Sequence, residues 1–491
     1  MSWDISFYTG LKKPGFFSLR ALFSMLVACT ALGGTRYVMY LLSWNSKKNK
    51  KLAERRRIIE QANKEESSDK QFLFDRQCIF NSMEVEGVFI NPFPEWRGVP
   101  FWKLCLRQVI LIFYPSGSYK SSELDRDLPV VKPNLKLLFD AELSSDSYSR
   151  NSGPAGSRGL EPWEKEKVVL RKGVELFDEC ANLNIEQRIT FTWLGHSTCF
   201  IQFGGVNILT DPMFSDKPIA ILGPKRLRNI PCQLTDLKVD IVLVTHNHPD
   251  ALDEYSVKIL ANSVTWYVPL GMKAWFLKRG VFNVTELDWW GEVIYPPNPS
   301  LKISFTPSQH WSGRTLLDID RTLWGSFVVS IEGGPSMFHC GDTGYCQVFK
   351  EIGRRYGPFR LATLPIGSYQ PRSLTQSFHV SPDEALAIHK DLRSQLSFGI
   401  HWGTFIVSDE HYLDPQRRLT EMRGDQNFLT SRLGETRCMP LAYSATPSFD
   451  IVTDTVKHDM SPSLSSSAIL LSEAQSELEE ESGSEGYYTI N

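Results

Sequence analysis

The amino-acid sequence predicts an α/β fold, more closely an α+β arrangement of four layers (αββα), in which two sheets lie face to face between outer helices. The main observation is a pattern that occurs twice, over 198–212 and over 326–342. It consists of two strand-like runs, a Gly-Gly turn between them and an acidic loop after them. A second observation is that apolar runs of strand length occur elsewhere in this region. Two similar sets of strands indicate two sheets that bury one face against each other.

Each repeated unit has the composition of a β-hairpin, because glycine pairs allow the positive φ angles of tight turns. The first unit consists of 198–203, Gly204-Gly205, 206–209 and Asp211-Pro212, and the second of 326–331, Gly333-Gly334, 336–338 and Gly341-Asp342. We therefore expect two hairpins, each ending in an acidic loop.

The outer helix with the clearest signals begins after Ser381. Ser381 has the residue type of an N-cap, Pro382 fits the first helical turn, and Glu384 completes a capping box. We interpret His389, near the end of this helix, as a surface or core histidine.

Composition limits the class of protein. The chain has 491 residues, 22% of them charged, and a formal net charge of −3. This charge argues against nucleic acid as a partner, because phosphate neutralisation needs a concentrated basic surface. None of the nine cysteines forms a C-x-x-C pair, which favours reduced thiols on the cytosolic side over a disulfide framework.

Changes in composition along the chain predict five segments. They are a hydrophobic membrane anchor over 1–45, a basic connector over 46–70, an N-terminal extension over 71–183 with a flexible insertion at about 141–163, a compact domain over 184–445, and a disordered acidic tail over 446–491.

The predicted anchor is the apolar stretch 16–44, which Arg20 and Arg36 interrupt. Lysines and arginines are denser after it than before it, so the positive-inside rule places the following domain in the cytosol. An interfacial anchor and a cleaved signal peptide are the alternatives to a spanning helix. The sequence does not identify the organelle.

The most informative motif is His246-Asn247-His248-Pro249-Asp250, which follows the apolar, β-branched run 239–244. Alternate residues at the end of a strand can point to one side, so His246 and His248 can bind one cation with Asp250 beside it. Imidazole and carboxylate donors suit zinc and similar metals. The alternative is a solvated turn with incidental histidines.

Three further residues of ligand type make that alternative less favourable. His310, Asp342 and His401 each follow an apolar stretch. Small residues near them allow close approach of the backbone. With the histidine motif, they predict a metal centre formed by loops at strand ends.

The chain also contains the longer strings Thr192-Trp193-Leu194-Gly195-His196-Ser197-Thr198, Leu209-Thr210-Asp211-Pro212, Gly223-Pro224-Lys225-Arg226, Thr245-His246-Asn247-His248, Gly341-Asp342-Thr343-Gly344-Tyr345-Cys346 and Ile400-His401-Trp402-Gly403-Thr404-Phe405. Taken together, these strings resemble the family of phospholipases D that hydrolyse N-acylphosphatidylethanolamine, which has the metallo-β-lactamase fold. The resemblance extends over roughly Phe89 to Arg437 and implies that the compact domain is catalytic.

The resemblance implies two Zn²⁺ ions. One is held by His246, His248 and His310, the other by Asp250 and His401, and Asp342 bridges both. The implied reaction converts a membrane phospholipid to an N-acylethanolamine and phosphatidic acid. Two cations lower the pKa of a shared water, which gives hydroxide at neutral pH. Asp250 and Asp342 are the implied catalytic residues.

The resemblance also implies substrate-binding positions. His379 matches a histidine that contacts the substrate phosphate, with a structural role as the alternative. Pro249 replaces an aromatic residue that the family uses against the substrate. We expect Asp211 and His196 to support the metal ligands by hydrogen bonds; a turn role for Asp211 and a structural role for His196 are the alternatives.

One position departs from the family pattern H-x-H-x-D-H, because Ala251 stands where the second zinc expects a histidine. Nearby Asp253 is out of register as a replacement. The alternatives to an active phospholipase D are therefore a degenerate metal- and lipid-binding relative with little turnover, or another hydrolase of this fold, such as a lactonase or phosphodiesterase. The expected partners are the phospholipid substrate and the bilayer, and a homodimer is left open.

Overall fold

The computed structural model describes residues 39–40, 42–58, 80–98, 119–139, 183–218, 224–315 and 317–442. The predicted anchor over 1–45 lies mostly outside these residues, and the insertion at about 141–163 and the tail over 446–491 lie wholly outside them. Within the described ranges, no helix has both the length and the apolar character needed to cross a bilayer.

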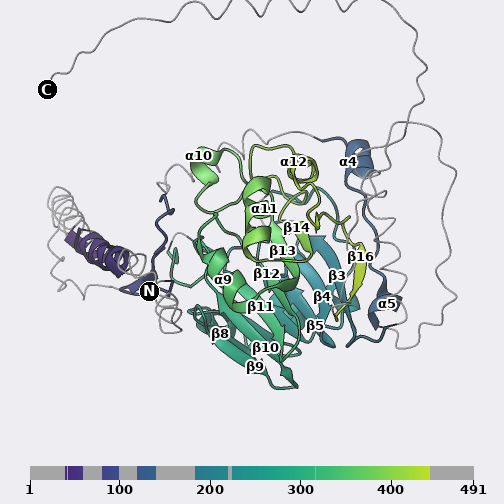
Figure 1. Cartoon of the computed structure of the whole chain (residues 1–491), viewed down its shortest axis with the longest axis horizontal. Helices are drawn as coiled ribbons and strands as arrows, with labels where there is room; N and C mark the ends of the chain where they lie inside the picture. Colours follow the sequence, from purple (N-terminus) through teal and green to yellow (C-terminus); the bar gives the residue numbers. More distant parts are fainter. Residues whose placement is uncertain are drawn as a thin grey trace, which may run out of the picture. The chain divides into compact units, whose positions relative to one another are not determined.

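Two mixed sheets of seven strands each form the body of the protein (Figure 1). The first sheet contains, in spatial order, β16 (Thr436–Pro440), β3 (Arg188–Gly195), β4 (Thr198–Phe203), β5 (Val206–Thr210), β6 (Ile241–Leu243), β7 (Thr265–Pro269) and β8 (Val284–Leu287). The second contains β15 (Phe428–Leu429), β14 (Ser397–Ile400), β13 (Phe359–Pro365), β12 (Ser336–His339), β11 (Ser326–Ile331), β10 (Asn298–Thr306) and β9 (Glu292–Tyr295).

The two sheets have the same internal plan. In the first, β16 to β5 pair antiparallel and β5 to β8 pair parallel. In the second, β9 to β12 pair antiparallel and β12 to β15 pair parallel. The predicted hairpins are confirmed as β4–β5 and β11–β12. The run 239–244 forms a shorter strand than expected, because only Ile241–Leu243 pair with β5 and β7.

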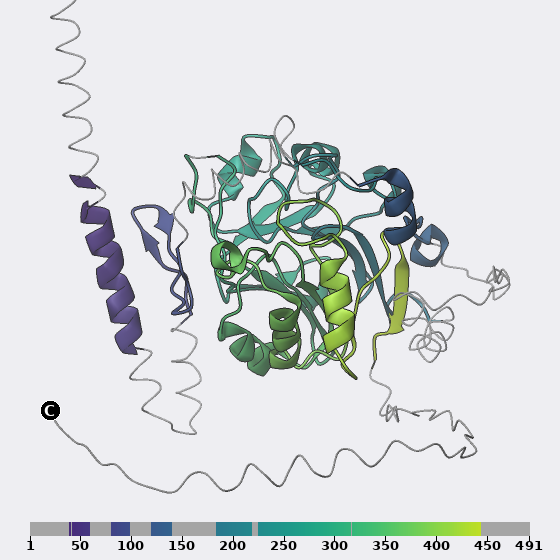
Figure 2. The same cartoon turned by 90° about the horizontal axis from the view of Figure 1, so that it is seen from above.

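Helices lie on the outer side of each sheet, as the predicted αββα arrangement requires (Figure 2). The helices and turns of the main body are η1 (Leu234–Asp236), α7 (Glu254–Leu260), α8 (Lys273–Leu277), α9 (Val348–Tyr356), α10 (Arg372–Thr375), α11 (Pro382–Asp391) and α12 (Asp414–Met422). The capping box of α11 is confirmed, since the Ser381 N–H donates to Glu384 Oε2 over 3.1 Å. His389 is a core residue, with Nδ1 2.8 Å from Ser397 Oγ.

In the first sheet, β3, β4 and β6 are buried on both faces along their whole length, whereas the outermost strands β8 and β16 are partly exposed. Successive side chains of a strand point to opposite faces. In β3, Phe191 and Trp193 face the core between the sheets, whereas Leu194 faces the outer layer. That outer layer includes Val257 of α7 and Phe276 of α8.

The two sheets are joined by one large apolar core. Phe191 of β3 stacks on Phe398 of β14, with ring centroids 4.3 Å apart and planes 8° from parallel. Trp193 stacks similarly on Trp402, at 5.2 Å. These pairs hold the carboxyl end of β14 against β3, close to the loops that carry the candidate site.

The N-terminal extension packs on this body through β1 (Glu84–Val85), β2 (Val88–Phe89), α4 (Ser121–Asp127) and α5 (Leu135–Phe139). Residues 42–58 form a helix whose Trp44 packs on the β1–β2 hairpin and donates through Nε1 to the Val85 carbonyl over 3.2 Å. After β2, the buried Asn91 donates to the backbone carbonyl of His310 over 2.6 Å. The extension therefore supports a loop of the candidate site.

Candidate metal centre

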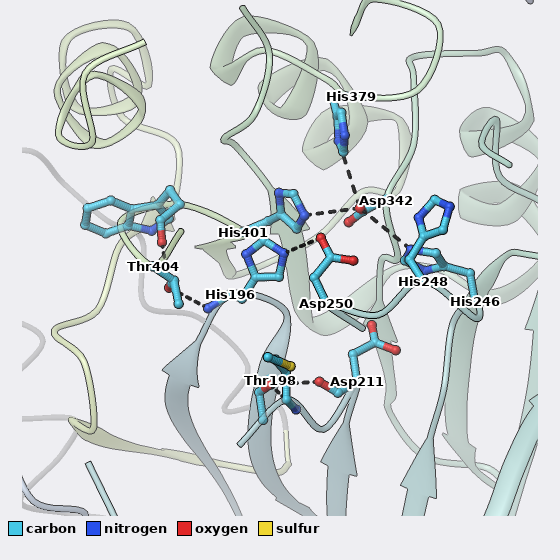
Figure 3. A network of polar contacts seen from close by, with 12 residues as sticks. His196, Thr198, Asp211, His246, His248, Asp250, Asp342, His379, His401 and Thr404 are labelled. Carbon is cyan, nitrogen blue, oxygen red and sulfur yellow. Dashed lines mark hydrogen bonds and ion pairs between the residues drawn. The ribbon is translucent and has the colours of Figure 1, made fainter. Parts of the chain in front are cut away.

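Loops that leave strands at one edge of the two sheets carry the predicted ligands (Figure 3). The loop after β6 carries His246, His248 and Asp250, the loops after β10 and β12 carry His310 and Asp342, and His401 directly follows β14. Parallel strands end at the same edge of a sheet, so residues far apart in the sequence meet there. The structure brings all six predicted ligands together.

The first group consists of His246, His248, His310 and Asp342, all buried, each with one donor atom within 4.8 Å of the others. His310 Nε2 lies 3.3 Å from His248 Nδ1. Asp342 Oδ2 lies 3.8 Å from His246 Nε2 and 3.9 Å from His310 Nε2. Three imidazoles and a carboxylate around one point form a donor set typical of zinc.

Hydrogen bonding fixes the tautomer of His246. The carboxylate of Asp211 can only accept, so the Thr245 hydroxyl donates to Asp211 Oδ2 over 2.9 Å. The Thr245 oxygen then accepts from the Nδ1–H of His246, also over 2.9 Å. Nε2 of His246 is therefore the nitrogen with the free lone pair, and it faces the centre.

The same reasoning applies to His310. Its Nδ1 lies 3.0 Å from the backbone carbonyl of Phe378, which can only accept, so Nδ1 carries the proton. The lone pair of His310 is on Nε2, the atom that lies beside His248 Nδ1. A cation beside this nitrogen would accept its lone pair.

The second group consists of His196, Asp250 and His401, and Asp342 connects it to the first because Asp342 also groups with His379 and His401. Asp342 Oδ2 lies 3.1 Å from His401 Nε2, and Asp250 Oδ2 lies 3.1 Å from His196 Nε2. Asp250, His401 and His196 each have one donor atom within 4.8 Å of the others. Ala251 is buried beside them and has no donor atom in its side chain. His196 thus lies among the ligands.

Buried atoms without hydrogen-bond partners show that this centre fits a cation. Among the described residues, His246 Nε2, His248 Nε2 and Asp342 Oδ1 are buried and have no hydrogen-bond partner. Buried polar atoms are almost always paired, because an unpaired one costs about 1–3 kcal/mol. A divalent cation would satisfy several of these atoms at once.

Burial also sets the protonation states that metal binding requires. It lowers the pKa of His248 and of His379 to about 3, and the pKa of His310 well below its usual range. Burial alone would raise the pKa of Asp342, but the neighbouring His401 outweighs it and holds that pKa well below the usual range. At neutral pH these histidines are therefore neutral and the carboxylate is ionised.

For Asp250, burial would raise the pKa, but the hydrogen bond from His196 outweighs it and lowers the pKa below the usual range. For His401, burial would lower the pKa, but Asp342 outweighs it and raises the pKa. The second group thus combines an ionised carboxylate with a histidine that strongly attracts a proton when no cation is bound.

Asp211 supports His246 through Thr245 and does not bond to it directly, which differs from the expected direct hydrogen bond to a ligand histidine. Its Oδ1 accepts from the Thr245 N–H over 2.7 Å, and its Oδ2 lies 3.1 Å from His339 Nε2. His339 in turn lies 2.7 Å from Thr363 Oγ1. No local pattern marks His339 as part of this network, because its partner Asp211 is 128 positions away.

Two site residues keep contact with solvent. The Asp250 side chain is 23% exposed and the His379 side chain 15%, whereas the side chains of His246, His310 and His401 are at most 2% exposed. His379 Nδ1 lies 4.0 Å from Asp342 Oδ2. Pro249 is also partly exposed. These residues mark the side from which water and substrate can reach the centre.

A polar cavity of about 640 Å³ lies next to the loops of the site. Its lining includes Gln309 and Ser377, which neighbour His310 and His379 in sequence, together with Arg97 and Arg372. Arg372 is already engaged, since it donates to both carboxylate oxygens of Glu384 over 2.7 Å.

The remaining sequence alternatives are decided by local contacts. Asp253 caps α7, with its carboxylate accepting from the N–H groups of Ser256 and Phe214, and takes no part in the metal groups. Near the string Gly223-Pro224-Lys225-Arg226, Arg226 is buried and donates to backbone carbonyls, and Arg228 pairs with Asp125 over 2.6 Å. Both arginines therefore have structural contacts.

Two adjacent tryptophans lie in the turn between β8 and β9. Trp289 is a core residue that donates to the Trp324 carbonyl over 2.6 Å. Its neighbour Trp290 is partly buried and packs against the main core. Both tryptophans therefore contribute to packing.

Known proteins with similar sequences include metal-dependent hydrolases. A family model described as a beta-lactamase superfamily domain matches residues 206–402. The chain is 36% identical over 378 residues to the N-acyl-phosphatidylethanolamine-hydrolyzing phospholipase D, mitochondrial, of Saccharomyces cerevisiae, covering 73% of this chain and 77% of that one.

It is 39% identical over 270 residues to N-acyl-phosphatidylethanolamine-hydrolyzing phospholipase D 1 of Caenorhabditis elegans, covering 51% of this chain and 76% of the relative. Among solved structures, a metallo hydrolase from the archaeon Ignicoccus hospitalis is 22% identical with a TM-score of 0.41, over 51% of this chain and 98% of that one.

Proposed function

The chain belongs to the family of N-acyl-phosphatidylethanolamine-hydrolysing phospholipases D, and from that premise we propose that it is a metal-dependent phospholipase D. Its substrate would be an N-acylphosphatidylethanolamine, and its products an N-acylethanolamine and phosphatidic acid. The observation that carries the proposal is the convergence of His246, His248, His310 and Asp342 on one point, in a chain of this family.

The metal would be zinc, with two ions per chain. His246, His248 and His310 would hold the first ion, and Asp250 and His401 would contribute to the second. Asp342 has Oδ2 close to His401 and within 4 Å of the first group, so it would lie between the two ions. Support comes from the chemistry of the donors, since imidazole nitrogen with carboxylate oxygen suits zinc.

Bound divalent cations make a water molecule easier to deprotonate and stabilise negative charge on phosphoryl oxygens. The protein would supply the remaining functions. Asp250 is partly exposed and has an ionised carboxylate, so it can orient the attacking water and accept its proton. His379, also partly exposed and within 4.0 Å of Asp342, can contact the substrate phosphate.

Hydrolysis exchanges one bond to phosphorus for another. The water oxygen forms a bond to phosphorus, and the bond from phosphorus to the ethanolamine oxygen breaks. One proton of the water passes to Asp250 or its solvent neighbours, and the departing oxygen takes up one proton to become the hydroxyl of the N-acylethanolamine. Phosphatidic acid keeps the phosphate. Pro249 borders the entrance and would contact the lipid.

The substrate is a membrane lipid, and the helix over 42–58 would keep the enzyme at the bilayer. Residues 47–57 contain seven lysines and arginines and one glutamate. A basic segment gains about 1 kcal/mol per cationic residue at an anionic leaflet. We propose that this helix lies at the cytosolic surface of a membrane, after the anchor. Assembly as a homodimer stays a prediction that the mass of the purified protein will test.

The proposal is tested with purified full-length protein and N-acylphosphatidylethanolamine in mixed micelles. We expect release of N-acylethanolamine, its loss on chelation and its return with zinc. His246→Ala should lower kcat about 100-fold or more, because the first ion loses a ligand. His411→Asn is the matched control, since His411 is exposed and outside both metal groups.

Failure of the zinc-loaded wild type to release N-acylethanolamine would overturn the proposal. An inactive protein that still binds zinc and lipid would instead support the degenerate relative that Ala251 suggests.

A further inference from the structure

The second metal position is one donor short. Where the family pattern has a histidine after Asp250, this chain has Ala251, whose methyl group cannot bind a cation. Only Asp250, His401 and the shared Asp342 then remain of the expected ligands. We propose that His196, in the turn between β3 and β4, supplies the missing nitrogen as a ligand of the second ion. This inference rests on the proposed two-metal function.

Distances around His196 match those among the other ligands. His196 Nε2 lies 3.1 Å from Asp250 Oδ2, just as His401 Nε2 lies 3.1 Å from Asp342 Oδ2. Donors about 2.0–2.1 Å from a tetrahedral zinc lie about 3.3 Å apart. The His196–Asp250 pair therefore has the separation of two ligands on one ion.

The rings agree with this placement. The centroids of His196 and His401 are 3.8 Å apart, with their planes tilted by 36°. Figure 3 shows both imidazoles directed toward the Asp250 and Asp342 carboxylates. His196 is 2% exposed, so its ring cannot turn outward without opening the turn.

The backbone of His196 has an uncommon conformation, with φ at +53°. Its N–H donates to Thr404 Oγ1 over 2.7 Å, and its carbonyl accepts from Trp193 Nε1 and from the His401 N–H, each over 2.9 Å. Backbone conformations of this kind are strained for residues other than glycine and concentrate at functional sites. The bond between the two histidine backbones also fixes the spacing of the two rings.

A purely positioning role, in which His196 only donates a hydrogen bond to Asp250, makes a different prediction. Glutamine has an amide N–H at about the reach of Nε2 and can donate to a carboxylate, but its nitrogen has no lone pair available for a metal, and its neutral amide oxygen is not among the usual zinc ligands. His196→Gln therefore preserves positioning and replaces an imidazole ligand by, at most, a much weaker one. Ala251→His restores a histidine at the family position and serves as the compensating change.

The test is metal content by elemental analysis after equilibration with limiting free zinc, together with the visible absorption of the Co²⁺-substituted protein. We expect about two ions per chain in wild type and in His411→Asn, about one in His196→Gln, and about two again in His196→Gln/Ala251→His. The Co²⁺ spectrum should lose the component of the second site in His196→Gln. The ion retained in the first site shows that this variant is folded.

Two outcomes overturn the inference: His196→Gln with two ions and the wild-type Co²⁺ spectrum, or no recovery of the second ion when Ala251→His is added. Neither outcome decides the proposed function, which fails separately if the wild type binds no metal or does not hydrolyse the lipid.

Discussion

The hydroxyl oxygen of Thr245 lies 2.9 Å from Nδ1 of His246, and the same hydroxyl donates to Asp211. This contact commits Nε2 of His246 to the metal centre. Asp211 also contacts His339 in the second sheet, so the hydrogen bonds extend from His246 through Thr245 and Asp211 to His339. The carboxylate of Asp211 is therefore the fixed point from which one ligand is oriented.

Thr245→Val removes the hydroxyl and keeps the shape of the side chain. We expect the affinity for zinc to fall about 10–100-fold, because residues that orient a ligand histidine have effects of this size. Competition with a chromogenic chelator measures the affinity. Thr420→Val is the control, since the Thr420 hydroxyl bonds only within α12. Equal zinc affinity in Thr245→Val and wild type would contradict the proposed orienting role.

Removing the metal should lower thermal stability. The ligands come from loops of both sheets, so a cation in the centre links the two layers of the core. At a free zinc concentration a hundredfold above Kd, binding contributes about 3 kcal/mol, which corresponds to several degrees in Tm. Calorimetry with and without chelator measures the shift. His246→Ala should show a smaller shift, and an equally large one would count against a cation in the first group.

The free energy of unfolding should depend on pH through Asp320. Its carboxyl group is partly buried and accepts a hydrogen bond from the Ser312 N–H over 3.1 Å. Burial raises its pKa to about 6, above the value of 3.8 for an unperturbed aspartate. A group with a raised folded-state pKa contributes stability that is present below about pH 4 and is lost as pH rises through 6.

Asp320→Asn removes the decrease in stability that ionisation of Asp320 causes. The variant should gain stability relative to wild type, and the gain should grow by about 1 kcal/mol between pH 5 and pH 7.5. Denaturant unfolding of both proteins at the two pH values measures it. A gain that is constant with pH, or that shrinks toward pH 7.5, would show that the carboxyl is not protonated in the folded state.

The basic helix should bind anionic membranes. Arg56→Glu/Arg57→Glu reverses two charges of this helix, so binding to vesicles with phosphatidylserine should weaken about tenfold or more and lose much of its salt dependence. Sedimentation with vesicles measures binding, and neutral vesicles are the control. Turnover of a short-chain substrate in solution should be unchanged, because the helix lies outside the metal groups. Unchanged vesicle binding would contradict the proposal that this helix contacts the membrane surface.

Much of the fold could be predicted from the sequence because most strands are largely apolar runs bounded by turn residues. The Gly204-Gly205 and Gly333-Gly334 hairpins and the α11 capping box have local signals, and the structure has them where expected. The meeting of His246 and His401 could be predicted because each lies just beyond the end of a strand. Their roles in binding zinc stay predictions.

Contacts between residues that are distant in the sequence have no local sequence pattern that marks them. The support of His310 by Asn91 joins residues 219 positions apart, and neither residue has a neighbour that marks the contact. The place of His196 among the ligands depends on the φ of +53° and on its backbone bond to His401. Neither can be inferred from residue types, so the sequence favoured a supporting role.

The position of β16 has a consequence for how the protein is made. Residues 436–440 pair with 188–192, so β3 gains its second neighbour only after almost all of the described chain has left the ribosome. Until then an edge of β3 is unpaired, and an exposed edge of this kind invites aggregation. Nascent chains that stall before Thr436 should therefore depend on chaperones.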